Sequence, residues 1–137
     1  MTPWPLSVAF PLTLLGSIAV ILACDAVGAW FARRGMFTYK NLWPVQFGLY
    51  LVIGFVSMLT LLDLRWVEAV GAITGLVEST LGWYITWRMG PGRLKDANVV
   101  SIGIVVLSMT AFGFGFAIIG ALLFNAVAGA MLRAHAS

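Results

Sequence analysis

Residues 66–87 read WVEAVGAITGLVESTLGWYITW, and this stretch decides the fold that we expect. Glu68 and Glu78 are its only charged residues. About 20 mainly apolar residues are enough for a helix to cross the hydrocarbon core of a bilayer. The sequence Gly-Pro-Gly at residues 90–92, which breaks helices, follows it closely. The stretch therefore predicts one membrane-spanning helix.

Three more apolar runs have the length of a membrane span: residues 12–32, 45–62 and 99–124. Pro11 and Pro44 precede the first two. A proline suits the first turn of a helix, because the N–H that it lacks would have no partner there. We therefore expect an all-α integral membrane protein with four transmembrane helices, arranged as two similar helical hairpins. This single four-helix domain over residues 1–137 leaves no room for a soluble domain.

The composition excludes several other classes of protein. Hydrophobic side chains make up 61% of the 137 residues, charged side chains make up 9%, and the mean hydropathy is +1.00. Soluble domains average about 45–50% apolar and about 25% charged residues. The single His and single Cys cannot form a disulfide or a Cys/His zinc site, so we expect no metal site. They also leave too few candidate groups for an enzyme, and the sequence identifies no cofactor.

The last apolar run is longer than a membrane requires. It continues to Leu132, and 34 residues of helix would be about 51 Å long, against a hydrocarbon core of about 30 Å. Two outcomes are open. Either the helix tilts and projects from the bilayer, or it breaks near Gly113 and Gly115 or after Phe124.

Basic residues gather in the two longer loops, which share one side of a four-span protein. These loops carry Arg33, Arg34, Lys40, Arg88, Arg93 and Lys95, against Arg65 and Arg133 on the other side. An excess of Lys and Arg marks the cytoplasmic side, so we expect cytoplasmic loops and both termini outside, in a plasma or bacterial inner membrane. The clusters also suit contact with anionic lipid headgroups. They explain the net charge of +3 without nucleic acid.

The two halves of the sequence resemble each other. Asp-x4-Trp-Phe-x-Arg-x-Gly at residues 25–35 corresponds to Glu-x4-Trp-Tyr-x3-Arg-x-Gly at residues 78–90, an offset of 53. Two explanations are open. The first is the chemistry that any two helices share at one membrane interface. The second is an internal duplication, with the hairpins related by an axis along the membrane normal.

Asp25 and Glu78 are expected at similar depths, about 18–20 Å from the outer ends of their spans. A charged side chain at the centre of a span costs at least about 2.5 kcal/mol on insertion scales, so intramembrane acids usually mark ion paths, proton relays or partner contacts. No Lys or Arg lies near the middle of a span, so each acid must be protonated, hydrated, paired with a cation or met by another subunit. The alternative is a structural acid that packs against hydroxyl groups: Ser57, Thr60, Ser108 or Thr110.

Acidic and small residues recur along one face of the third span. Their spacing alternates between three and four residues, which keeps them on one side of a helix: Glu68, Gly71, Gly75, Glu78 and Gly82. Gly28 forms a similar stripe with Asp25 on the first span. Small residues let helix backbones approach closely in lipid. The stripe is therefore either a packing seam or a narrow hydrated path with Glu68 at its outer mouth and Glu78 inside.

Two functions fit these features. The first is a small transport-type or channel-type unit, assembled as a homo-oligomer, in which Asp25, Glu78 and Glu68 are candidates to bind protons or a cation. The second is an accessory or scaffolding subunit of a larger membrane complex, in which the acids and the glycine faces contact partner helices or cofactors. The lipid bilayer surrounds the protein in both cases.

Overall fold

The computed structural model describes residues 4–90 and 99–136, apart from the side chains of residues 40, 135 and 136. Within these ranges the chain is helical nearly throughout and contains no strand. The elements in chain order are α1 (Leu6–Arg33), η1 (Tyr39–Leu42), α2 (Trp43–Leu61), α3 (Leu64–Val77), η2 (Glu78–Gly82), α4 (Trp83–Met89) and α5 (Val99–Ala136). The all-α class that we expected is confirmed.

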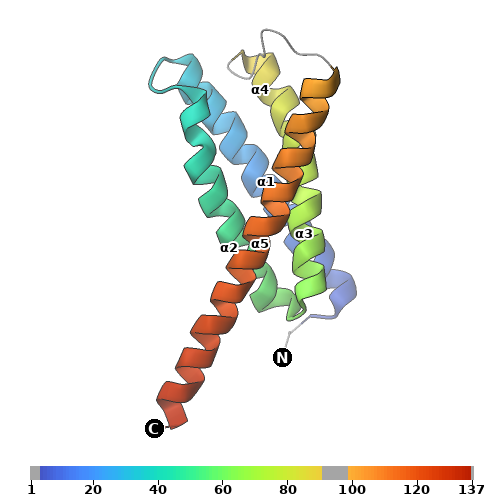
Figure 1. Ribbon diagram of the computed structural model, residues 1–137, viewed down its shortest axis with the longest axis vertical. Coiled ribbons are helices and arrows are strands. Elements are labelled where there is room, and N and C mark those ends of the chain that lie inside the picture. Colours follow the sequence, from blue (N-terminus) through green and yellow to red (C-terminus); the bar gives the residue numbers. More distant parts are fainter. Residues whose placement is uncertain (1–3, 91–98, 137) are drawn as a thin grey trace.

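Successive long helical segments run in opposite directions and form a bundle (Figure 1). α1 starts at the end of the bundle where both termini lie, α2 returns to that end, α3, η2 and α4 lead away again, and α5 returns. We call the end with both termini the terminal end. The opposite end, where α1 and α4 finish and α5 starts, is the loop end.

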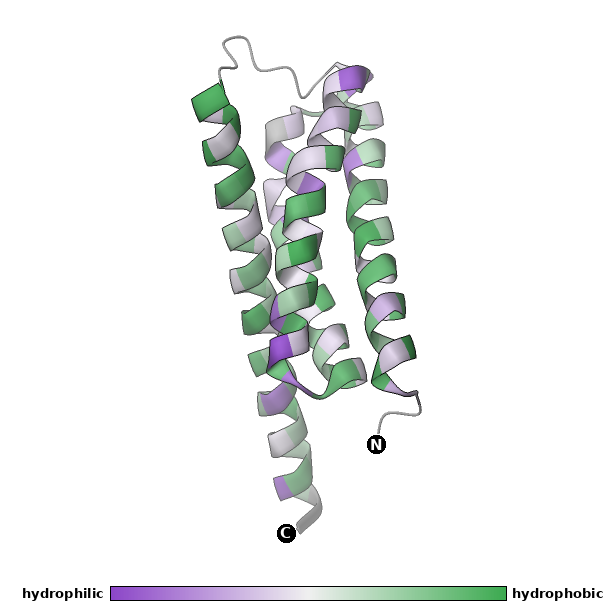
Figure 2. Cartoon of the chain, turned by 90° about the vertical axis from the view of Figure 1, so that its right-hand side faces the viewer, coloured by the Kyte–Doolittle hydropathy of each residue, from purple (hydrophilic) through white to green (hydrophobic). Residues whose placement is uncertain are grey.

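Three of these helices, α1, α2 and α5, are long and apolar enough to cross a membrane. Hydrophobic residues cover the helices along most of their length (Figure 2). These are the properties of an integral membrane protein, whose backbone polar groups must be satisfied inside each span. The expected third span, residues 66–87, is helical as well, but η2 separates a helix of 14 residues from one of seven.

The element η2 is a π turn, in which the helix takes up an extra residue. One residue corresponds to a rotation of about 100° in an α-helix, so the residues beyond η2 face a different neighbour. Gly71 and Gly75 face α5, whereas Gly82 faces Asp25 on α1. The prediction of one continuous stripe from Glu68 to Gly82 is therefore wrong, because the π turn divides it between two partners.

The helix α5 is unbroken over 38 residues, about 57 Å at 1.5 Å per residue. Of the two outcomes left open by the sequence, the structure has the projecting helix, and Leu132 lies on it. α5 packs against α2 and α3, and its C-terminal part extends beyond the rest of the terminal end (Figure 1).

Small residues bring α5 very close to α2. A methyl group at Gly120 would overlap the backbone of Leu51 on α2, and one at Gly54 would overlap the backbone of Ala117 on α5. Ala117 and Ala121 are fully buried. Close backbone approach through small residues is a common way for helices to associate in lipid. These α2–α5 positions were not among the packing residues predicted from the sequence.

The two prolines expected at helix starts, Pro11 and Pro44, occupy different positions in their helices. α1 starts at Leu6, so Pro11 lies inside this helix, and its expected place in the first turn is wrong. The carbonyl of Pro5 accepts the N–H groups of Val8 and Ala9 at the true start. Pro44 has its expected place in the first turn of α2.

The two hairpins do not pack in the same way. α2 contacts α3, whereas the equivalent pair under a two-fold repeat, α1 and α5, does not pack together within the described ranges. The internal duplication therefore stays a prediction.

Three of the basic residues expected at one membrane surface lie at the loop end: Arg33, Arg34 and Arg88. The guanidinium carbon of Arg34 lies 3.9 Å from the centre of the Trp30 ring, a cation–π contact. The side chain of Lys40, and all of Arg93 and Lys95, lie outside the described residues. The assignment of the loop end to the cytoplasm stays a prediction.

Candidate functional site

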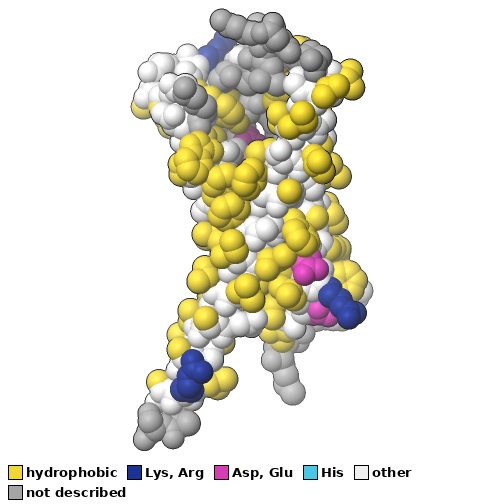
Figure 3. All heavy atoms as spheres, viewed as in Figure 1, with side chains coloured by type: hydrophobic (Ala, Val, Ile, Leu, Met, Phe, Trp, Pro, Cys, Tyr) yellow, Lys and Arg dark blue, Asp and Glu magenta, His cyan; other side chains and the backbone are white. Residues whose placement is uncertain are grey.

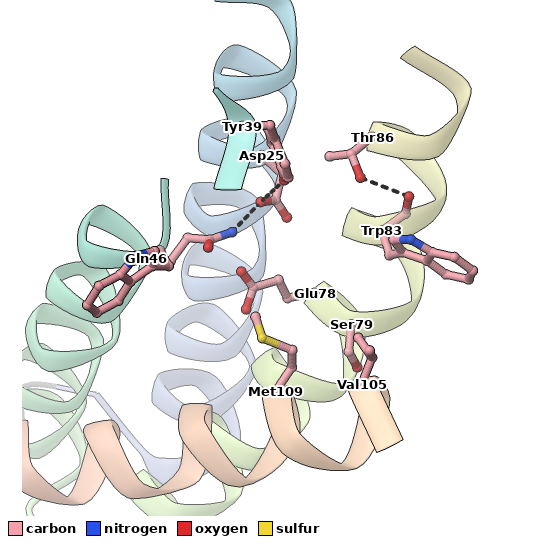
Figure 4. A pocket seen from close by; sticks show the side chains of 10 residues that line it. Asp25, Tyr39, Gln46, Glu78, Ser79, Trp83, Thr86, Val105 and Met109 are labelled. Atoms are coloured by element: carbon pink, nitrogen blue, oxygen red, sulfur yellow. Dashed lines mark hydrogen bonds between the residues drawn. The ribbon is translucent and has the colours of Figure 1, made fainter. Parts of the chain in front are cut away.

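A cavity of about 230 Å³ lies near the loop end, between α1, η1, α2, η2, α4 and α5. Its polar lining consists of Asp25, Tyr39, Gln46, Glu78, Ser79 and Thr86 (Figure 4). The rest of its wall is formed by Trp43, Trp83, Val105 and Met109. An acidic side chain is visible in a hollow near the loop end (Figure 3). The cavity thus brings two buried carboxyl groups to one partly open space.

Asp25 is almost completely buried, with 1% of its surface exposed. Its Oδ1 atom accepts two hydrogen bonds, from Gln46 Nε2 at 2.7 Å and from the Tyr39 hydroxyl at 3.1 Å. Burial raises the pKa of Tyr39, and the nearby Asp25 raises that pKa further, so the phenol stays protonated and able to donate. Two donors on one oxygen stabilise a negative charge there.

Glu78 is 3% exposed and is the first residue of the π turn. Its Oε2 atom accepts a hydrogen bond from the Tyr50 hydroxyl at 2.5 Å. Its Oε1 atom is buried and has no hydrogen-bond partner in the described part of the chain. An unpaired buried oxygen is costly, and the exceptions in folded proteins usually have a functional reason.

The close approach of α1 to η2 depends on Gly82. A methyl group at this position would occupy the place of Asp25 Oδ2 and would lie 3.4 Å from Cγ of Glu78. The missing side chain therefore lets the two acids share one cavity. Asp25, Glu78 and Gly82 are the predicted residues that the structure brings together.

No Lys or Arg among the described residues lines the cavity. A buried carboxylate without a cationic partner is strongly disfavoured. The donors Gln46, Tyr39 and Tyr50 are neutral and offset only part of this cost. Chemically, the site is suited to take up a proton or another cation.

The cavity is closed toward the terminal end by a buried apolar layer. Ile21 of α1, Tyr50 and Ile53 of α2, and Val70 of α3 belong to one cluster of buried side chains. Ile21 lies about one helical turn from Asp25 on the terminal side. This layer separates the two acids from the terminal end in this conformation.

The remaining predicted site residues lie elsewhere. Gly28 packs against Leu42, where an added methyl carbon would lie 2.5 Å from the leucine Cδ2, and Gly71 and Gly75 pack against α5. Glu68 lies four residues after the start of α3, near the terminal end, and does not line the cavity. Glu68 is thus separated from the two acids, and the hydrated path from Glu68 to Glu78 stays a prediction.

The hydrogen-bond partners of the acids differ from the hydroxyl groups that we considered. Thr60 bonds Thr13 and its own helix, Thr110 bonds the Val106 carbonyl, and the buried Ser57 hydroxyl has no partner in the described structure. None of these residues, nor Ser108, lines the cavity. These four partners were wrong, because α2 turns Gln46 and Tyr50 toward the acids and α5 turns Val105 and Met109 toward the cavity.

The true partners, Gln46, Tyr50 and Tyr39, were missed. Gln46 and Tyr50 are four residues apart and therefore share one face of α2. This polar pair inside an apolar run is the signal that could have found them. Tyr39 lies in the short 3-10 helix η1 between α1 and α2, where no helical spacing identifies it as a partner of the acids.

Comparison of the chain with known protein families, with curated proteins and with solved structures finds no match.

Gly82→Ala is expected to lower the free energy of unfolding by about 1–3 kcal/mol, because the added methyl group displaces the Asp25 carboxyl group from its two donors. On helix propensity alone, Gly→Ala gains up to about 1 kcal/mol. Gly103→Ala is the matched control, since a methyl group there meets nothing within 4 Å. Unfolding in a detergent titration, followed by circular dichroism, measures both. Equal stabilisation of the two variants would contradict the described approach of α1 to η2.

Proposed function

We propose that this protein is a four-span membrane protein of transport or channel type, in which Asp25 and Glu78 bind protons or a cation. The observation that carries the proposal is the pairing of two buried carboxyl groups in one cavity whose described lining contains no Lys or Arg. Intramembrane acids that face a cavity commonly mark ion pathways and proton relays.

The fourth crossing is the path formed by α3, η2 and α4. It runs from Leu64 to Met89 without interruption, 26 residues or about 39 Å, which is enough for a hydrocarbon core of about 30 Å. A π turn inside a membrane helix keeps its backbone hydrogen-bonded, so it is compatible with a span. Four crossings also agree with both termini at one end of the bundle.

The buried apolar layer on the terminal side of the cavity supports either a transport cycle of the carrier type or a channel gate. Ile21, Ile53 and Val70 belong to the buried cluster between the acids and the terminal end. Transport requires a second conformation in which this layer opens. The crossings of α1 with η2 and α4 are where such a change would act on the acids.

The test is proton movement in liposomes that contain the purified protein and an internal pH-sensitive dye. A pH gradient with a potassium–valinomycin potential supplies the driving force. We expect the internal pH to change faster than in protein-free vesicles. A rate equal to that of protein-free vesicles over the whole pH series would overturn the proposal.

A second candidate is an accessory subunit of a larger membrane complex. The projecting part of α5 favours it, because this segment extends beyond the other described helices and carries exposed apolar side chains such as Val127 and Leu132. Native mass spectrometry after gentle extraction distinguishes the two candidates. Transport predicts a homo-oligomer, in which α5 contacts a second copy, and the accessory function predicts larger complexes with different chains.

A further inference from the structure

We propose that the cation taken up by this cavity is an organic ammonium ion, with its charged head at Asp25 and Glu78 and its apolar substituent in an adjoining groove between α4 and α5. This inference rests on the proposed function and names the class of its cation. Four observations support it.

The first observation is the unsatisfied oxygen of Glu78. Its Oε1 atom is buried without a partner in the described chain, and the carboxyl groups of Glu78 and Asp25 face the same space (Figure 4). Three neutral donors already occupy one oxygen of each acid, from Tyr39, Gln46 and Tyr50. The cavity therefore offers negative charge from two sides but few free ligand atoms.

The second observation concerns the number of ligands. Calcium takes six to eight oxygen ligands, and magnesium requires a near-ideal octahedron. The described residues contain no group of three His, Cys, Asp or Glu side chains that could hold a metal ion. An ammonium head requires only charge and shape, because it does not depend on a full shell of oxygen ligands.

The third observation is the aromatic wall. Tyr39, Trp43 and Trp83 line the same cavity as the two acids. Aromatic faces attract cations, tryptophan most strongly, and aromatic groups are the usual partners of quaternary ammonium ions. The cavity volume of about 230 Å³ equals that of roughly eight water molecules at about 30 Å³ each, which is ample for a trimethylammonium head.

The fourth observation is the adjoining groove, with a volume of about 400 Å³. Ser79 and Trp83 belong to both the cavity and the groove, and Tyr84, Trp87 and Ile102 line the groove alone. The narrow space between them, bounded by Trp83 and Val105, has no room for a water molecule. A ligand with a charged head and an apolar substituent matches this pair of spaces, and Trp83 must move for it to occupy both.

The experiment is isothermal titration calorimetry of the full chain in lipid nanodiscs. Benzyltrimethylammonium probes both spaces, tetramethylammonium probes the cavity alone, and sodium probes an inorganic cation. We expect benzyltrimethylammonium to bind about tenfold or more tightly than tetramethylammonium, and sodium to compete with neither. Glu78→Gln should abolish the binding of both ammonium ions.

Two tryptophan variants test the groove. Trp87→Leu, which changes the groove but not the cavity, should remove the roughly tenfold advantage of benzyltrimethylammonium while tetramethylammonium still binds. Trp83→Leu should weaken both ions. Trp30→Leu is the matched control, because Trp30 is exposed and lines neither space, and its affinities should equal those of the unaltered chain.

The outcomes separate this inference from the proposed function. Proton movement in liposomes without ammonium binding, or displacement of both ammonium ions by sodium, would overturn the inference and leave the proposed function standing. Equal binding of the two ammonium ions would overturn the assignment of the groove. The absence of both proton movement and ammonium binding would overturn the inference and the proposed function together.

Discussion

Glu78→Gln should reduce proton movement in liposomes to the rate of protein-free vesicles. Glutamine has nearly the size of glutamate, and its amide oxygen can still accept the hydrogen bond from Tyr50. It cannot take up or release a proton at physiological pH. Asp25→Asn keeps an acceptor for Gln46 and Tyr39 in the same way and should have the same effect. Both variants therefore remove charge and leave the packing of the cavity in place.

Glu68→Gln is the matched control for these two variants. Glu68 is a carboxyl group of the same chain, but it is partly exposed near the terminal end and does not line the cavity. We expect its rate to equal that of the unaltered protein. If Glu78→Gln and Asp25→Asn moved protons at the unaltered rate, the assignment of the two acids would be wrong.

Gly120→Ala should destabilise the bundle by about 3 kcal/mol or more, or prevent its assembly. The added methyl group would overlap backbone atoms of Leu51 and Phe55 on α2, and backbone cannot move aside as a flexible side chain can. α2 and α5 would have to separate along their crossing. Gly54→Ala produces the same conflict from the other side, with the backbone of Ala117.

The control for this prediction is Gly115→Ala, on the same helix as Gly120. A methyl group at Gly115 meets nothing within 4 Å, so this variant should be neutral or stabilised by up to about 1 kcal/mol. Thermal unfolding and size-exclusion chromatography in detergent compare the variants. A stable, monodisperse Gly120→Ala protein would show that α2 and α5 do not cross as closely as described.

The helices were predictable from the sequence because apolar runs of sufficient length have few alternatives in a membrane. The expected run at residues 45–62 corresponds to α2, Trp43–Leu61, within two residues. The similar depths of Asp25 and Glu78 along their predicted spans indicated that the two acids could lie close together. Depth depends on counting residues along each helix, which the sequence supplies directly.

The partners of the acids were harder to predict, because they depend on how each helix is rotated about its own axis. The π turn illustrates this point. The regular spacing from Glu68 to Gly82 is typical of an uninterrupted α-helix, yet the segment contains a π turn at the point where it contacts α1 and α5. The local spacing of residues in the sequence does not indicate tertiary contacts of this kind.

The close packing of α5 against α2 and α3 has a recognisable pattern in the sequence of α5, although we did not predict the packing from it. Gly113, Ala117 and Ala121 repeat every four residues, the small-residue pattern that brings helices together in lipid. Gly54, which contacts Ala117 from α2, is six residues from Gly48, the other glycine of that helix, and this spacing does not place the two on one face. One side of such a contact can be predicted more readily than the other.

The lengths of α2 and α5 together determine how the protein responds to membrane thickness. α2 has 19 residues, about 29 Å, and so has no length to spare over a hydrocarbon core of about 30 Å. α5, with 38 residues, is about 57 Å long, nearly twice the thickness of that core. In a thicker bilayer, α5 can still span the hydrocarbon core by reducing its tilt, whereas α2 is too short to do so. Hydrophobic mismatch would therefore fall on α2, the helix that supplies Gln46 and Tyr50 to the two acids.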